Sequence, residues 1–181
     1  KALSGRATRR VCGGGSMTTL ILGGTFNPVH QGHIHLAHAA LRATLGSRLV
    51  MLPSFAPTHR SNDSLLSYEL RFALLLAVRE LFANAAVSDI ERRHDGRAFT
   101  IDILPRLIAE EGIERPCFAM GLEQFTRLPR WYRGKDIPRM TDVAVLPRDD
   151  LDQARFHSVI QTNWPEFAHD ATARDCRACY R

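Results

Sequence analysis

Apolar residues along this chain alternate between short continuous runs and helically spaced positions. Runs typical of buried strands lie at residues 17–24, 48–52, 86–90, 116–120 and 142–146. Helical spacing between these runs predicts helices at 32–45, 67–83 and 101–111, and a short helix and loop at 125–137. Strands that alternate with helices predict a single-domain α/β fold, a doubly wound parallel sheet of Rossmann-like type.

Two of the predicted helices carry further local detail. In the helix at 67–83, Ser67 is a candidate N-cap, and one apolar stripe is predicted from residues spaced three or four apart, namely Leu70, Leu74, Ala77 and Leu81. The helix at 101–111 contains Pro105, which is tolerated only in a first helical turn. This helix is therefore expected to begin near Asp102 or to be kinked, after a charged loop at 91–97.

Charge divides the chain into a short leader and one domain. The chain has 181 residues and a formal net charge of +5. Residues 1–16 hold four basic residues and no acidic ones, so residues 17–181 carry only +1. We expect residues 1–16 to be a disordered leader or a remnant of cloning, with Met17 as the native start of the domain. An RNA-binding role depends on the charge of this leader alone.

Four cysteines, Cys12, Cys117, Cys176 and Cys179, are expected to stay reduced in a cytoplasmic protein. The pair Cys176 and Cys179 has a spacing seen in redox and zinc sites, and His157 and His169 lie upstream of it. A zinc site normally needs a second pair of ligands at a similar spacing, so we predict no metal site.

The stretch from Leu20 to Ala40 predicts a strand, a glycine turn and then a helix. A helix N-terminus that follows a strand presents free N–H groups and a partial positive charge, which favours phosphate binding. Glycine at the turn allows the backbone to approach a ligand closely. His30 and His33 lie at the start of the helix, so two imidazoles join the backbone donors.

The run Gly23-Gly24-Thr25-Phe26-Asn27-Pro28-Val29-His30-Gln31-Gly32-His33 resembles the G-x-[FY]-x-P-x-H-x-G-H signature of the nucleotidylyltransferases. Within them it is most similar to the bacterial nicotinate-mononucleotide adenylyltransferases. The resemblance implies transfer of AMP from ATP to nicotinate mononucleotide, giving deamido-NAD and pyrophosphate. It assigns catalysis to His30, His33 and Thr25. It also implies an ATP and phosphate site formed by Gly23, Gly24, Thr25, Phe26, His30, Gly32, His33, Gly121 and Glu123.

Three later segments extend the resemblance. Pro57-Thr58-His59-Arg60 matches a P-x-H-[KR] segment, and Ala98-Phe99-Thr100-Ile101-Asp102 matches a [YF]-T-[IV]-D segment. The resemblance implies a nicotinate mononucleotide site formed by His59, Arg60, Phe99, Thr100 and Trp131. A solvated loop at 57–60 and a helix-capping role for Thr100 are the alternatives.

The segment Gly121-Leu122-Glu123, followed by Trp131, matches a fourth part of the family pattern. The resemblance implies that Glu123 accepts hydrogen bonds from the adenosine ribose and that Trp131 stacks on the pyridine ring. Leu122 is bulkier than the residue that the family usually has there, which weakens the assignment of adenosine contacts.

The resemblance covers residues 17–147, and the family's later S-[SA]-T-x-[IL]-R segment is missing. Asp170–Arg174 contains a threonine and an arginine, but at the wrong spacing. We expect Mg²⁺ to arrive with ATP, held by phosphates and water. The expected partners are small molecules only, without nucleic acid or membrane, in a possible homo-oligomer. The alternatives are pantetheine-phosphate adenylyltransferase and a non-catalytic nucleotide-binding module.

Overall fold

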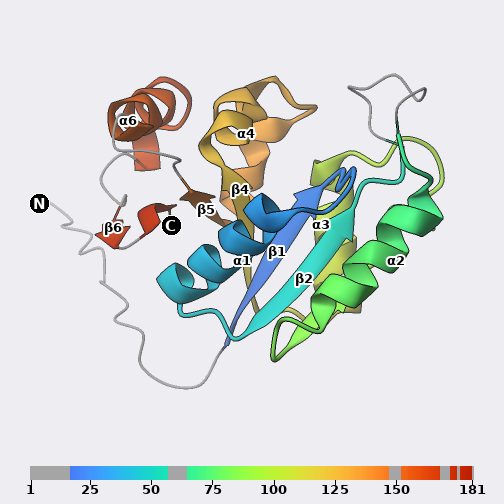
Figure 1. Ribbon diagram of the computed structural model, residues 1–181. Helices are drawn as coiled ribbons and strands as arrows, with labels where there is room; N and C mark the ends of the chain where they lie inside the picture. The colour runs from blue at the N-terminus through green and yellow to red at the C-terminus, as the bar shows by residue number, and fades with distance from the viewer. Residues whose placement is uncertain (1–16, 57–64, 147–151, 168–171, 175, 181) are drawn as a thin grey trace, which may run out of the picture.

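A twisted β-sheet lies between two layers of helices (Figure 1). The computed structural model describes residues 17–56, 65–146, 152–167, 172–174 and 176–180. Within these residues the sheet has seven strands in the order β3-β2-β1-β4-β5-β7-β6. The strands are β1 (Thr18–Gly24), β2 (Arg48–Pro53), β3 (Ala85–Val87), β4 (Arg115–Gly121), β5 (Asp142–Leu146), β6 (Thr172–Arg174) and β7 (Cys176–Tyr180).

Strands β1 to β5 are parallel, as the sequence predicts. The chain winds outward from β1 through β2 to β3 and then returns to the other side of β1 with β4 and β5. This reversal places the topological switch point between β1 and β4, where ligands bind in doubly wound sheets. The antiparallel strands β7 and β6 extend the sheet beyond β5, and the sequence prediction did not include them.

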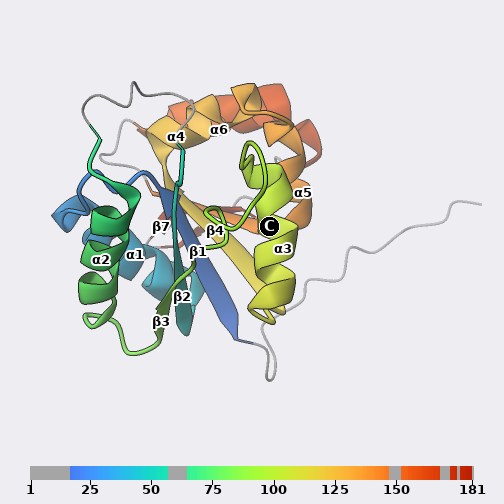
Figure 2. The ribbon, with the colours of Figure 1, turned by 90° about the vertical axis from the view of Figure 1, so that its right-hand side faces the viewer.

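Helices cover both faces of the sheet, as the two perpendicular views show (Figures 1 and 2). One face carries α1 (Gln31–Thr44) and α2 (Tyr68–Arg79), and α3 (Thr100–Glu110) lies on the other. The remaining helical segments are α4 (Leu122–Arg127), η2 (Leu128–Arg130), η3 (Gly134–Asp136), α5 (Ile137–Met140), α6 (Asp152–Asn163) and η4 (Pro165–Phe167). Within the described residues, no helix is both long enough and apolar enough to cross a bilayer.

Strand β1 divides its side chains between two hydrophobic cores. Leu20 and Leu22 belong to the core under α1 and α2, whereas Ile21 belongs to the core on the α3 side. Successive side chains of a strand point to opposite faces, so a continuous apolar run is required where both faces are covered. This is the physical reason that the runs of apolar residues predicted the strands.

Several predicted elements differ in extent from those observed; the helix predicted at 67–83, for example, ends at Arg79. Helix α3 begins at Thr100, two residues before the predicted start, and Pro105 therefore lies in its second turn rather than its first; the alternative of a kink stays a prediction. The third strand spans Ala85–Val87 rather than 86–90. Its pairing ends early because the chain turns away after Ser88, whose N–H still donates to the Met51 carbonyl at 2.9 Å.

The predicted buried face of α2 is wrong. Leu70 is 47 % exposed, and Leu81, which is 57 % exposed, lies beyond the end of α2, whereas the buried residues of α2 are Tyr68, Arg71 and Leu75. Apolar residues occur on every side of α2, so their spacing does not identify the buried side. The side that packs on the sheet also carries Arg71, and a charged residue is not expected to be buried. The prediction of Ser67 as the N-cap is confirmed, because its hydroxyl accepts from the Leu70 N–H at 3.2 Å.

Candidate active site at the switch point

The two histidines of the motif cap helix α1 together. His30 is the N-cap residue, and its Nδ1 accepts a hydrogen bond from the Gly32 N–H at 3.1 Å. His33 is the third residue of the helix, and its Nδ1 accepts from the His30 N–H at 3.3 Å. This reciprocal pattern is a capping box, formed here by imidazoles instead of the usual hydroxyl and carboxylate.

The capping box determines which ring nitrogen carries the proton. An Nδ1 that accepts from a backbone N–H is unprotonated, so in each neutral ring the proton is on Nε2. The His30 and His33 rings lie side by side, with centroids 3.9 Å apart. Burial, and then the neighbouring His30, lowers the pKa of His33 to about 4, so His33 is neutral near pH 7. The result is a pair of neighbouring Nε2–H donors beside a helix N-terminus.

Gly32 lies between the histidines, where the capping box leaves little room for a side chain. A Cβ at this position would lie 3.0 Å from Cε1 and from Nδ1 of the His30 ring. A larger residue would therefore displace the His30 ring by a few tenths of an ångström and weaken its bond to the Gly32 N–H. This explains in physical terms the glycine of the H-x-G-H pattern.

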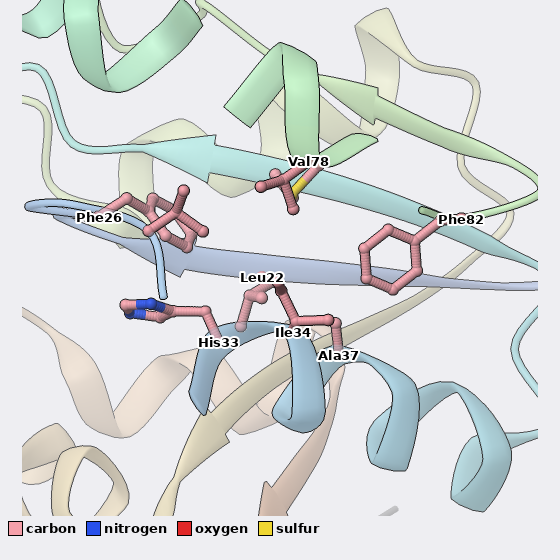
Figure 3. A pocket seen from close by; sticks show the side chains of 9 residues that line it. Leu22, Phe26, His33, Ile34, Ala37, Val78 and Phe82 are labelled. Carbon is pink, nitrogen blue, oxygen red and sulfur yellow. The ribbon is translucent and has the colours of Figure 1, made fainter. Parts of the chain in front are cut away.

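The loop between β1 and α1 has an unusual backbone. Phe26 has a φ of 49°, in the left-handed region that non-glycine residues rarely occupy, and its side chain is buried. The Phe26 ring lies 4.9 Å from the His33 ring, and Figure 3 shows the two together at one end of an apolar layer. The buried Phe26 ring thus supports both the motif loop and the imidazole of His33.

The hollow drawn in Figure 3 is a packing crevice between α1, α2 and the sheet, rather than a substrate cleft. Its lining is apolar apart from His33, and consists of Leu22, Phe26, Val29, His33, Ile34, Ala37, Met51, Val78 and Phe82. It is too narrow to admit a water molecule. We therefore place the candidate phosphate site on the solvent side of His30, which is exposed.

Strand β4 ends beside the first turns of α1. Gly121 is the N-cap of α4, and a Cβ there would meet only Leu36 of α1, at 4.0 Å. Glu123 lies exposed in the first turn of α4 and forms an ion pair with Arg127 at 2.7 Å. Leu122 points into the core, so its bulk does not obstruct this edge. The structure thus brings Gly121 close to the β1–α1 junction.

The predicted pyridine-binding residues lie on the α3 side of the sheet. Phe99 precedes α3, and its ring lies 4.5 Å from that of Tyr132. Trp131 follows η2, is half-buried, and packs against the same core as Phe99. Thr100 is the first residue of α3 rather than its N-cap, and no side chain caps that helix, so the alternative role of Thr100 as a cap is wrong. His59 and Arg60 lie outside the described residues.

A buried polar cluster behind the motif loop was missed by the sequence analysis. Arg71 is 2 % exposed, and its guanidinium donates to backbone carbonyls of the loops after β1 and β2. Glu91, which follows β3, accepts from the Phe55 N–H at 3.0 Å. Burial raises the pKa of Glu91 to about 7, opposed by the Phe55 hydrogen bond and the charge of Arg71. The sequence signal that could have revealed this cluster is Arg71, a charged residue one turn before the buried Leu75 in an apolar helix.

Metal-binding side chains do not gather in the part of the chain that the structure describes. Within it, no group of three or more histidine, cysteine, aspartate or glutamate residues is placed to hold a metal ion. Cys117 is buried in β4. The side chains of Cys176 and Cys179 lie outside the described part of the structure, as does His169.

The fold and the motif define a doubly wound α/β protein with an H-x-G-H sequence at the start of α1, and comparison with known sequences gives its family. The profile of the cytidylyltransferase-like family matches residues 21–174, so the chain belongs to that family.

Curated relatives carry a more specific name, probable nicotinate-nucleotide adenylyltransferase. One from Synechococcus sp. is 33 % identical over 74 % of this chain and 66 % of its own length. One from Trichormus variabilis is 32 % identical over 71 % of this chain and 60 % of its own length. One from Listeria innocua is 29 % identical over 84 % of this chain and 81 % of its own length. The chain spans about two thirds or less of the length of the first two.

Solved structures share the fold. The nicotinic acid mononucleotide adenylyltransferase of Plasmodium falciparum, complexed with NaAD, superposes with a TM-score of 0.62 at 15 % identity, over 80 % of this chain and 70 % of that one. The structure of a protein described as a putative nicotinate-nucleotide adenylyltransferase, from Vibrio parahaemolyticus, gives a TM-score of 0.61 at 18 % identity, over 81 % of this chain and 82 % of that one.

Proposed function

We propose that this chain is a nicotinate-nucleotide adenylyltransferase. A phosphate oxygen of nicotinate mononucleotide attacks the α-phosphorus of ATP, the bond to the β-phosphate breaks, and deamido-NAD and pyrophosphate form. The observation that carries the proposal is the imidazole capping box at the start of α1, which leaves two Nε2–H donors beside the positive end of the helix. The names of the curated relatives support the choice of substrate.

The proposed reaction needs positioning and charge stabilisation more than a general base. The second pKa of a phosphate monoester is near 6, so the attacking group is largely a dianion at neutral pH. The task left to the protein is to align the two phosphates and to stabilise negative charge as it moves to the leaving group. His30 and His33 serve this role as Nε2–H donors, with the Thr25 hydroxyl and nearby amides.

Mg²⁺ is part of the same proposal, as a companion of ATP that offsets the charge of the triphosphate. Phosphate oxygens and water would hold it, since the described residues offer no cluster of carboxylates for a dedicated site. Glu123 is proposed to accept from the ribose hydroxyls, in exchange for its surface ion pair with Arg127. An exposed pair of this kind contributes little stability, so the exchange costs little.

A panel of phosphate acceptors tests the proposed function. Pyrophosphate release is measured with ATP and, in turn, nicotinate mononucleotide, nicotinamide mononucleotide and phosphopantetheine. We expect the highest kcat/KM with nicotinate mononucleotide. Preference for phosphopantetheine would overturn the substrate assignment, and ATP binding in calorimetry without release from any acceptor would identify a non-catalytic nucleotide-binding module.

Trp131→Ala is expected to raise the KM for nicotinate mononucleotide about tenfold and to change the KM for ATP much less. The reason is that stacking of a flat heteroaromatic ring on an aromatic side chain contributes about 1–3 kcal/mol. Trp131→Phe is the matched control, because it keeps an aromatic face and should retain most of the affinity. A larger rise in the KM for ATP would show that the pyridine ring binds elsewhere.

A further inference from the structure

One buried arginine connects the loops at the carboxyl ends of β1 and β2. Arg71 Nη1 donates to the carbonyl oxygens of Thr25 at 2.6 Å and of Ser54 at 2.8 Å. Its Nε donates to the Leu66 carbonyl at 3.1 Å, and Nη2 lies 3.5 Å from the Phe55 carbonyl. All of these acceptors are backbone groups of loops that surround the motif.

The partners of Arg71 are unusual for a buried charge. Among the described residues, no carboxylate lies within ion-pair distance of its guanidinium, and the Glu91 carboxylate instead holds the Phe55 N–H. Placing a charged group in the interior is costly unless its hydrogen-bond donors are satisfied. The planar fork of arginine satisfies several carbonyls in fixed directions, which the flexible ammonium of lysine does not reproduce.

The bond to Thr25 determines the orientation of one peptide in the motif loop. The Thr25–Phe26 peptide is trans, so its C=O and N–H point in opposite directions. Since the carbonyl points to Arg71, the Phe26 N–H points away from it. The left-handed φ of Phe26 requires this support, because an isolated loop would relax from that region. The Phe26 ring also lies beside the His33 ring, so amide and imidazole occupy the same corner of the site.

We infer that Arg71 is a positioning residue for nucleotidyl transfer. By holding the Thr25 carbonyl, it aims the Phe26 N–H at the phosphates that His30 and His33 bind. Arg71 itself touches no substrate, because its guanidinium is occupied by loop carbonyls. The inference rests on the proposed function for the identity of the reaction, but its structural part, control of the Thr25–Phe26 peptide by Arg71, is independent of any substrate.

Kinetics of Arg71→Met and Arg71→Lys test the catalytic part. The kcat of Arg71→Met, expressed per folded molecule, is expected to fall about a hundredfold, which is the typical effect of losing one oriented donor. Either KM should change only slightly. Arg71→Lys keeps the charge, so its kcat per folded molecule should fall less. The matched control is Leu75→Ala, one turn further along the same buried face, which destabilises the fold but should keep kcat per folded molecule. If Arg71→Met does not fold, the kcat of Arg71→Lys per folded molecule provides the test.

The structural part has its own spectroscopic signal. Thr-Phe occurs once in the sequence, at Thr25–Phe26. Protein labelled with ¹³C at threonine carbonyls and ¹⁵N at phenylalanine therefore gives one carbonyl–amide correlation in an NMR spectrum. We expect this peak to move in ligand-free Arg71→Lys and to keep its position in Leu75→Ala. On addition of Mg·ATP it should shift in the wild type and shift less in Arg71→Lys.

The two kinds of failure are distinguishable. Wild-type protein that makes no deamido-NAD refutes the proposed function, whereas the NMR comparison of ligand-free proteins still tests the control of the peptide. Wild-type kcat per folded molecule in Arg71→Lys, or an unmoved Thr25–Phe26 peak in that variant, overturns the role of Arg71 even if the wild type is fully active.

Discussion

His33→Ala is expected to lower kcat for adenylyl transfer by roughly 10²–10³-fold, while the KM values for ATP and nicotinate mononucleotide change little. A donor fixed at the position where negative charge develops strengthens its hydrogen bond in the transition state more than in the ground state. The half-buried ring of His33 is fixed in this way, between the Phe26 ring and the His30 N–H. Steady-state kinetics with both substrates varied provide the measurement.

His35→Ala is the matched control for this prediction, because His35 lies exposed on the same helix two residues further on. It should retain wild-type kcat. The capping bond that His33 accepts from His30 contributes about 0.5–2 kcal/mol to the stability of the helix, so a thermal melt should show only a modest loss in His33→Ala. An unchanged kcat in His33→Ala would refute the role of this imidazole.

Gly134→Ala is expected to lower the free energy of unfolding by about 3 kcal/mol, at the upper end of typical overpacking costs. A Cβ at Gly134 would lie 1.9 Å from the Leu128 carbonyl oxygen and 3.0 Å from the Trp131 Cβ. The contact is with backbone, so no rotamer change relieves it, and the turn must shift. For a domain of this size the corresponding fall in Tm is roughly 6–12 °C.

The same variant also tests the position of the proposed pyridine site. The Gly134 N–H donates to the Trp131 carbonyl at 2.9 Å, so a shift of Gly134 displaces Trp131, and the KM for nicotinate mononucleotide should rise. Lys135→Ala, at the next and exposed position, is the control and should leave both Tm and KM unchanged. A wild-type Tm in Gly134→Ala would show that the turn is looser than the structure indicates.

The parallel part of the sheet was predictable because its strands are buried on both faces. The middle of a strand such as β1 is then a continuous apolar run, here Leu20, Ile21 and Leu22, which is visible without knowledge of its neighbours. The buried face of α2 was not predictable in the same way. Leu74, Leu75 and Leu76 are consecutive, so every face of that helix carries a leucine, and only contact with the sheet selects Leu75.

The candidate site also has a part that local sequence predicts and a part that it does not. The β1–α1 junction is local in sequence, so the pattern of glycines and histidines predicted the strand, the turn and a helix with both histidines at its start. The capping box that joins them was not predicted, although their three-residue spacing is typical of one. The contact between Phe99 and Tyr132, and the bond from Arg71 to Thr25, join residues far apart in the chain. They follow from the order of strands in the sheet, which no local pattern contains.

A crystal structure with deamido-NAD bound tests the central claim most directly, because this molecule contains the bond that the proposed reaction forms. We predict that its pyrophosphate oxygens lie about 2.7–3.2 Å from Nε2 of His30 and of His33, with the pyridine ring stacked on Trp131. Binding of the dinucleotide away from the start of α1, with both imidazoles free of phosphate, would contradict the account.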